Sequence, residues 1–174
     1  MKLTNDLFHA YFTKQIDIND FIKNLGIYEE DFLEQLLHEI KEVFIVQDAE
    51  RVEYLIYALW FWYNQIGREN VQELERFVDQ LNELLLSDWH YKHEDIALLL
   101  EEISSDKSIE YLYDAIELHP QYLSWDENYA FEVKCVRAIY YIGKEKAFPY
   151  LEKLCKHSNE VIREMAQRQI SKLT

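Results

Sequence analysis

The sequence predicts an all-α protein, and three observations support this fold class. The 174 residues include only three glycines and two prolines, too few for the many tight turns of an all-β fold. Apolar residues make up 49% of the chain, which is enough to bury a continuous core. These apolar residues recur at helical spacing along most of the sequence. We therefore expect a single all-helical domain over residues 1–174, divided into a divergent part (1–86) and a repetitive part (87–174).

The N-terminal part begins with two short helices that we expect to cap the fold. The first covers residues 6–14. The second begins at residue 17 or 19 and stops at Gly26, because glycine is the usual residue after a helix C-terminus. A longer helix follows over residues 28–46, where apolar residues line one face and acidic residues precede the first turn.

The next two helices complete the N-terminal part. Asp48 can cap a helix that is apolar on nearly all sides, as is typical of a central, buried helix. Gly67 ends it. Asn70 and Glu73 have the spacing of a capping box, which predicts that a further helix starts here and runs to Leu85.

The second half of the chain contains an internal repeat. Residues 94–116 align within residues 132–155 at a shift of 39, so that Leu99 falls on Ala138 and Ile103 on Ile142. Each copy predicts a helix, a tight turn and a second helix. Residues 159–170 repeat only the first helix, and its basic residues suit a polar end to the array. Because one such pair cannot bury its own apolar face, we expect stacked antiparallel helix pairs.

The charge distribution is uneven. The chain carries 33 acids against 18 Lys and Arg, a net charge of −15, which disfavours direct binding to nucleic acid or to an anionic membrane. Residues 93–131 hold ten of these acids and a single base, Lys107. This segment favours a cationic partner, although an acidic surface can also serve solubility alone.

The sequence predicts a cytoplasmic protein. Its longest apolar stretch, residues 54–63, is too short to cross a bilayer, and the first twelve residues lack the apolar core and cleavage site of a signal peptide. Cys135 and Cys155 lie among apolar helical residues, so we expect reduced thiols instead of a disulfide.

Three stretches of residues 87–173 resemble a known family. They read WHYKHEDI (89–96), YLSWD (122–126) and KCVRAIYYIG (134–143). These are similar to the WHxxHEDI, YLxxD and KCxxALxxIG patterns of bacterial HEAT-like repeat proteins. The resemblance implies a short HEAT-like α-solenoid. It also implies the role of an immunity protein, in which an acidic antitoxin neutralises the toxin domain, often a nuclease, of a polymorphic or contact-dependent system.

The candidate partner-binding surface combines aromatic and acidic residues, a composition suited to a protein hot spot. The connection over residues 119–128 is longer than the other connections in the repeats and is the best single recognition element. Asp126 and Glu127 could instead charge the N-terminus of the following helix. The full set of candidates is Trp89, His90, His93, Glu94, Asp95, Tyr122, Trp125, Asp126, Glu127 and Tyr129.

Two other interpretations of residues 88–95 remain open. His90 and His93 are three residues apart and are followed by Glu94, so they could form half of a metal site, although the usual order for such a site is HExxH. Alternatively, His93, Glu94 or Asp95 caps a helix while Trp89 packs inside. We expect no metal ion and no cofactor.

The sequence lacks the common catalytic motifs. It has no GxSxG, no Walker loop, no GxGxxG and no Cys–His arrangement, so we expect no enzyme. The leading hypothesis is an immunity-type inhibitor that occludes a basic toxin domain with the surface of residues 88–129. A HEAT-repeat scaffold of a non-toxin complex is the alternative. A metal-dependent hydrolase that uses His90, His93 and Glu94 is a third possibility.

Overall fold

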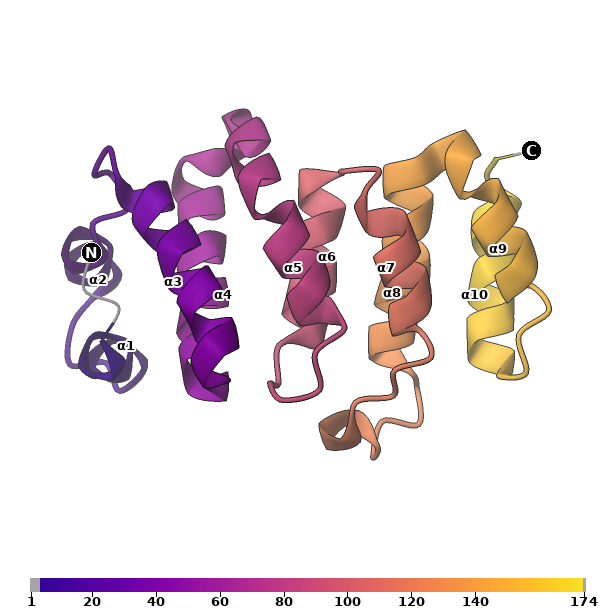
Figure 1. The fold of residues 1–174 in the computed structure, drawn as a ribbon, viewed down its shortest axis with the longest axis horizontal. Helices are drawn as coiled ribbons and strands as arrows, with labels where there is room; N and C mark the ends of the chain where they lie inside the picture. The colour runs from indigo at the N-terminus through magenta and orange to yellow at the C-terminus, as the bar shows by residue number, and fades with distance from the viewer. Residues whose placement is uncertain (1–3, 174) are drawn as a thin grey trace. The chain divides into compact units, whose positions relative to one another are not determined.

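The computed structural model describes residues 4–173, and their regular structure is entirely helical (Figure 1). The predicted all-α class is thus confirmed. No helix within these residues has both the length and the apolar character needed to cross a membrane. The chain divides into two compact units. Unit 1 comprises residues 1–76 and 89–91, and unit 2 comprises residues 77–88 and 92–174.

Unit 1 contains four α-helices whose ends follow from local side-chain chemistry. Asp17 and Asp48 accept hydrogen bonds from backbone N–H groups of the first turns of α2 and α4, as predicted. Gly26 ends α2 in the left-handed conformation at φ 75°. The four helices are α1 (Asn5–Phe12), α2 (Ile18–Leu25), α3 (Phe32–Val46) and α4 (Ala49–Gln65).

An aromatic cluster packs α1 and α2 against α4. Phe8 and Phe21 are fully buried and meet edge to face, with ring centroids 5.2 Å apart. Phe21 also contacts Phe61 of α4, and Tyr54 stacks on Phe8. Aromatic side chains on α4 therefore pack against aromatic side chains of the two capping helices.

The predicted helix over residues 70–85 is wrong in its first half. Residues Val71–Phe77 form a 3-10 helix, and the α-helix α5 begins only at Val78 and ends at Leu85. The Glu73 N–H donates to the backbone carbonyl oxygen of Asn70 at 2.9 Å, and the Asn70 side-chain amide donates to the carbonyl oxygen of Ile66, 3.2 Å away. The capping-box pattern thus competes with a local bond to the preceding turn.

Unit 2 contains the two helix–turn–helix copies that the internal repeat predicted. The first copy is α6 (His93–Ile103) and α7 (Ser108–Ala115), and the second is α8 (Ala130–Gly143) and α9 (Phe148–Leu154). A 3-10 turn, Lys144–Ala147, joins the second pair. The chain ends with α10 (Glu160–Ile170), which Asn159 caps.

The helix α8 is central in unit 2. It packs against α6 and α7 of the preceding copy and against α9 and α10 that follow it. Its buried residues include Cys135 and Ile139, as well as Ala138 and Ile142, which the repeat alignment placed opposite Leu99 and Ile103. Burial raises the pKa of the Cys135 thiol well above its ordinary value, as expected for a packing residue.

Candidate protein-binding surface

A long connection joins α7 to α8 and projects beyond the helix ends of unit 2, at the lower edge of Figure 1. It contains one short 3-10 turn, Gln121–Leu123. Trp125 lies on this connection with 77% of its surface exposed. An indole exposed to this extent buries little apolar area in the chain itself, so it is available to a partner.

Asp126 fixes the start of α8. Its Oδ2 atom accepts from the backbone N–H of Ala130 at 2.7 Å, and its Oδ1 atom accepts from that of Asn128 at 2.9 Å. These bonds, that of Ala130 first, hold the pKa of the Asp126 carboxyl below its ordinary value. Of the two roles considered for Asp126, the structure therefore shows the one at the helix N-terminus.

Tyr122 attaches the connection to α6 through His93. The His93 ring is buried, with Nδ1 3.2 Å from the Tyr122 hydroxyl and Nε2 2.8 Å from the carbonyl oxygen of Ser87. Because a carbonyl only accepts, Nε2–H donates to Ser87, and in the neutral imidazole Nδ1 accepts from Tyr122. Burial raises the pKa of the Tyr122 hydroxyl to about 12, so it stays protonated and able to donate.

A cavity of about 320 Å³ opens beside this anchored connection. Pro120 and Leu123 supply apolar surface. Glu132, from the first turn of α8, is only 6% exposed and accepts at Oε1 from Nδ1 of His119, 3.1 Å away. The residues that line the cavity are His119, Pro120, Leu123, Ser124, Asp126, Glu127, Tyr129 and Glu132.

Three ion pairs and one histidine–carboxylate contact link the first helix–turn–helix copy to the structure that follows it. In each of the four, an acid of residues 93–131 meets a Lys, Arg or His 36 to 40 residues later, and two of the ion pairs join α6 to α8. The Nε of Arg137 is 2.9 Å from an oxygen of Glu101, and His157 lies at the same distance from Glu117. The pairs are Glu94–Lys134, Glu101–Arg137, Asp106–Lys146 and Glu117–His157.

This ion-pair ladder changes how the acidic segment must be interpreted. Its members lie between successive helices of unit 2, so their charges are balanced within the chain and do not all face a partner. The exposed carboxylates outside the ladder include Glu110, Asp114 and Glu127. The anionic surface is therefore smaller than the ten acids of residues 93–131 suggested. Glu127 is its acidic residue on the connection between α7 and α8.

The structure separates the ten predicted residues into different environments. His90 and His93 are fully buried, so neither imidazole offers surface to a partner, and the surface proposed below omits both. Trp89 packs edge-on against Phe44, with ring centroids 6.1 Å apart, and it belongs to unit 1 together with His90. The connection brings together Tyr122, Trp125, Asp126, Glu127 and Tyr129 in unit 2.

The start of α6 differs from the expected capping. Its N-cap residue is Lys92, and no side chain caps the helix by a hydrogen bond. Glu94 and Asp95 lie in the first turn, where negative charge is favourable, and Asp95 pairs with Lys92. Glu94 pairs instead with Lys134. The predicted caps His93, Glu94 and Asp95 are wrong.

Local contacts engage two of the residues that the metal-dependent hydrolase hypothesis named, His93 and Glu94. Both ring nitrogens of His93 are engaged, and Glu94 is in an ion pair. Within the described part of the chain, no three His, Cys, Asp or Glu side chains are grouped so that they could hold a metal ion.

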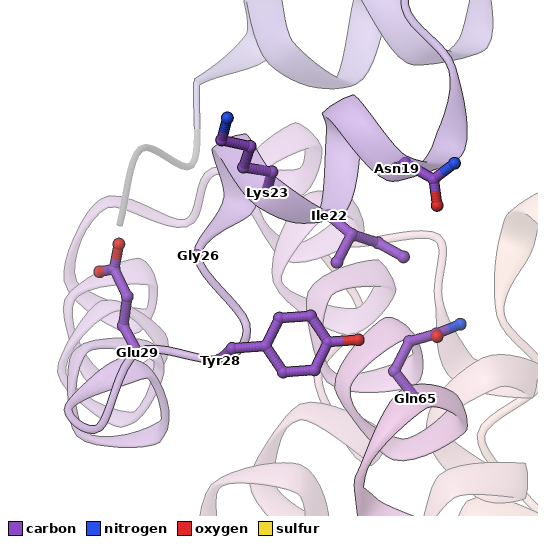
Figure 2. Close-up of a pocket in the computed structure, with 7 residues that line it drawn as sticks. All are labelled: Asn19, Ile22, Lys23, Gly26, Tyr28, Glu29 and Gln65. Atoms are coloured by element: carbon purple, nitrogen blue, oxygen red, sulfur yellow. The ribbon is translucent and has the colours of Figure 1, made fainter.

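A second cavity, of about 480 Å³, lies in unit 1, and the sequence did not indicate it (Figure 2). The ring of Tyr28 extends from the turn after α2 toward Gln65, the last residue of α4, with Ile22 above it. Lys23 and Glu29 carry opposite charges at its edge. No nucleophile or paired carboxylate lines this cavity, so it points to no particular chemistry.

Taken together, the helices and the anchored connection define an all-helical protein with a projecting aromatic and acidic surface. Comparison with known proteins adds no assignment, because no protein-family model, no curated protein and no solved structure matches this chain.

Proposed function

We propose that this protein binds another protein through the connection between α7 and α8, with Trp125 as the principal contact. The observation that carries the proposal is the 77% exposure of Trp125 on a connection that is fixed on both sides. Tyr122 fastens one part of it to α6, and Asp126 fastens the other to the N-terminus of α8. A held connection loses little conformational entropy on binding, so most of the energy from burying the indole is retained.

The magnitude supports a leading role for Trp125. Covering roughly 150 to 200 Å² of aromatic surface contributes about 4 to 5 kcal/mol at roughly 25 cal/mol per Å². Tryptophan is also the residue most enriched at positions that dominate protein interfaces. The remaining residues of the surface, Glu127 and Tyr129, supply the polar and aromatic rim.

The partner is a basic protein. Glu127 is exposed on the connection, and Glu110 and Asp114 are exposed on α7. These charges attract a cationic surface and accelerate its association. Together with the resemblance to HEAT-like immunity proteins, they favour an immunity-type inhibitor that occludes a basic, nuclease-type toxin domain. In this proposal the helix pairs of unit 2 form a short HEAT-like solenoid that presents the surface.

A protection assay tests this function directly. Cells that express the toxin domain from the neighbouring gene are expected to survive when the wild-type chain is co-expressed. Survival is expected to fall with Trp125→Ala, and to fall further when Glu127→Lys is added. Tyr28→Ala, at an exposed aromatic in unit 1, is the matched control and should protect like the wild type. Equal protection by Trp125→Ala overturns the proposed contact.

One observation favours a scaffold protein as the second candidate. Because the ladder uses Glu94, Glu101 and Asp106 internally, less negative charge remains to match a strongly basic toxin. A scaffold would bind its partner through the same Trp125 surface without inhibiting an activity. A complex that forms with a partner from the native host, in cells that show no protection, would identify this role.

A further inference from the structure

We propose that the cavity beside the α7–α8 connection receives an arginine side chain of the partner, with the indole of Trp125 stacked on its guanidinium group. This inference rests on the proposed function, because it names the chemical group that the same surface recognises. It assigns a ligand class, a guanidinium cation on a short aliphatic chain, to a cavity that the proposed function does not itself require.

The first observation is the state of Glu132. This carboxylate lines the cavity although only 6% of the residue is exposed. Its Oε1 atom accepts from His119, whereas no described residue donates to Oε2. Because Oε2 is not among the fully enclosed atoms that lack a partner, it is open to the cavity and can accept a hydrogen bond from a donor outside the chain.

The second observation is the size and character of the cavity. A volume of about 320 Å³ accommodates one long side chain but not a folded element. Pro120 and Leu123 offer apolar surface to the methylene groups of such a side chain. The hydroxyl of Ser124 and the carboxylates of Glu127 and Glu132 offer acceptors to its head group.

The third observation is the adjacent indole. Trp125 is exposed on the same connection, one residue before Asp126, which lines the cavity. A guanidinium group stacks on an indole face more readily than an ammonium group does, and its fork of N–H donors matches a carboxylate. The combination of acceptors inside the cavity and an exposed indole beside it therefore favours arginine over lysine.

A small-molecule titration tests this assignment in the full chain without the partner. The probe is N-acetyl-arginine methylamide, followed by backbone amide shifts in two-dimensional NMR. We expect saturable shifts at Asn128, Ala130 and Glu132 with a dissociation constant on the order of 1 to 10 mM, as is usual for a single side chain. The citrulline analogue, which has the same shape without the charge, should cause no saturable shift.

Variants identify the groups responsible. Glu132→Gln keeps the shape of the side chain and should weaken binding at least tenfold, whereas the control Glu152→Gln, at an exposed position of α9, should leave it unchanged. If Glu132→Gln does not fold, Glu127→Lys at the exposed rim replaces it with the same expected loss. Trp125→Ala should weaken binding several-fold.

Several results would overturn the proposal. These are no saturable shifts with the arginine probe, equal shifts with the citrulline analogue, binding of the corresponding lysine derivative at least as tight, or unchanged affinity in the Glu132 and Glu127 variants. A failed titration beside an intact, Trp125-dependent partner complex removes only the arginine assignment. A partner complex that is insensitive to Trp125→Ala removes the proposed function instead.

Discussion

Single residues hold the α7–α8 connection in place, and they do so by different means. Asp126 binds two backbone N–H groups at the start of α8 as a charged acceptor. Tyr122 is tied to α6 through the buried ring of His93. The ring of His93 also packs on Phe131, with centroids 5.6 Å apart. Because these bonds are specific, each can be removed separately.

The first prediction concerns Asp126 and pH. Its pKa in the folded protein lies below the ordinary 3.8, so its contribution to stability is complete above that value and is lost as pH falls through the lower folded-state pKa. Asp126→Asn should therefore lower the melting temperature near neutral pH, and this difference from the wild type should disappear at strongly acid pH. Thermal melts across pH measure it.

Glu127→Gln is the control for this pH profile. It removes the same charge from the next residue, which does not make the two backbone bonds of Asp126. A Glu127→Gln profile that matched the Asp126→Asn profile would show that charge alone, and not the cap, sets the pH dependence.

The second prediction concerns the buried histidine. His93→Phe keeps an aromatic ring between Tyr122 and Phe131 but removes the hydrogen bonds of the His93 ring with the Ser87 carbonyl and the Tyr122 hydroxyl. We expect the free energy of unfolding to fall by about 2 kcal/mol in urea denaturation. Tyr122→Phe, which removes one hydroxyl, should cost about 1 kcal/mol. If the His93→Phe variant has the same free energy of unfolding as the wild type, the structural role given to His93 is contradicted.

Among the elements, the ion-pair ladder links α6 to α8 and gives the repeat a fixed register. Acids at the first copy meet cations at the second, at separations close to the 39-residue shift of the repeat. The partners lie on successive helices, so one residue of slippage along a helix would separate them. We infer that the ladder contributes more to specifying the stacking than to its total stability.

A double-mutant cycle on Glu101 and Arg137 tests the ladder. The two side chains meet at 2.9 Å and are partly buried, so a coupling energy of about 0.5 to 1 kcal/mol is expected between Glu101→Gln and Arg137→Gln. The coupling should shrink as salt is added. Glu110→Gln combined with Arg137→Gln should be additive, and additivity in the Glu101 cycle would refute the ladder.

The helix boundaries show which structural features can be predicted from local sequence. Asp17, Gly26 and Asp48 act within one turn of their own backbone, and all three were predicted. The helix at residues 70–85 was misjudged because the Asn70 side-chain amide donates to the carbonyl oxygen of Ile66, and the sequence does not rank this bond against a cap of the following turn. The late start of α3 at Phe32 has a similar origin, since Glu29 N–H bonds back to Gly26 in a turn.

The candidate site was predictable only in part. The length and composition of the connection identified Trp125 and Asp126 correctly as features of one surface loop. The burial of His93 depends on Ser87 and Tyr122, which are tertiary or turn contacts that no local pattern encodes. The sequence did contain a signal for the ladder. Acids of the first copy are followed by Lys residues of the second copy at a separation close to the repeat shift of 39.

At the scale of the whole molecule, the negative charge is spread between the two units. Unit 1 carries 15 acids against 7 Lys and Arg, and unit 2 carries 18 against 11, so the net charges are −8 and −7. The C-terminal Lys and Arg of unit 2 therefore offset only part of the charge that its acids carry. In the proposed function, this general acidity favours a basic partner at long range, and the surface around Trp125 is where we expect that partner to dock.

The most direct test of this account is the affinity of the purified basic partner for three versions of the chain, measured by titration calorimetry. Trp125→Ala is expected to weaken the complex by at least about thirty-fold, the loss typical of a dominant interface residue. Tyr28→Ala, which changes another exposed aromatic, should bind like the wild type. If Trp125→Ala binds as tightly as the wild type, the connection between α7 and α8 is not the docking surface.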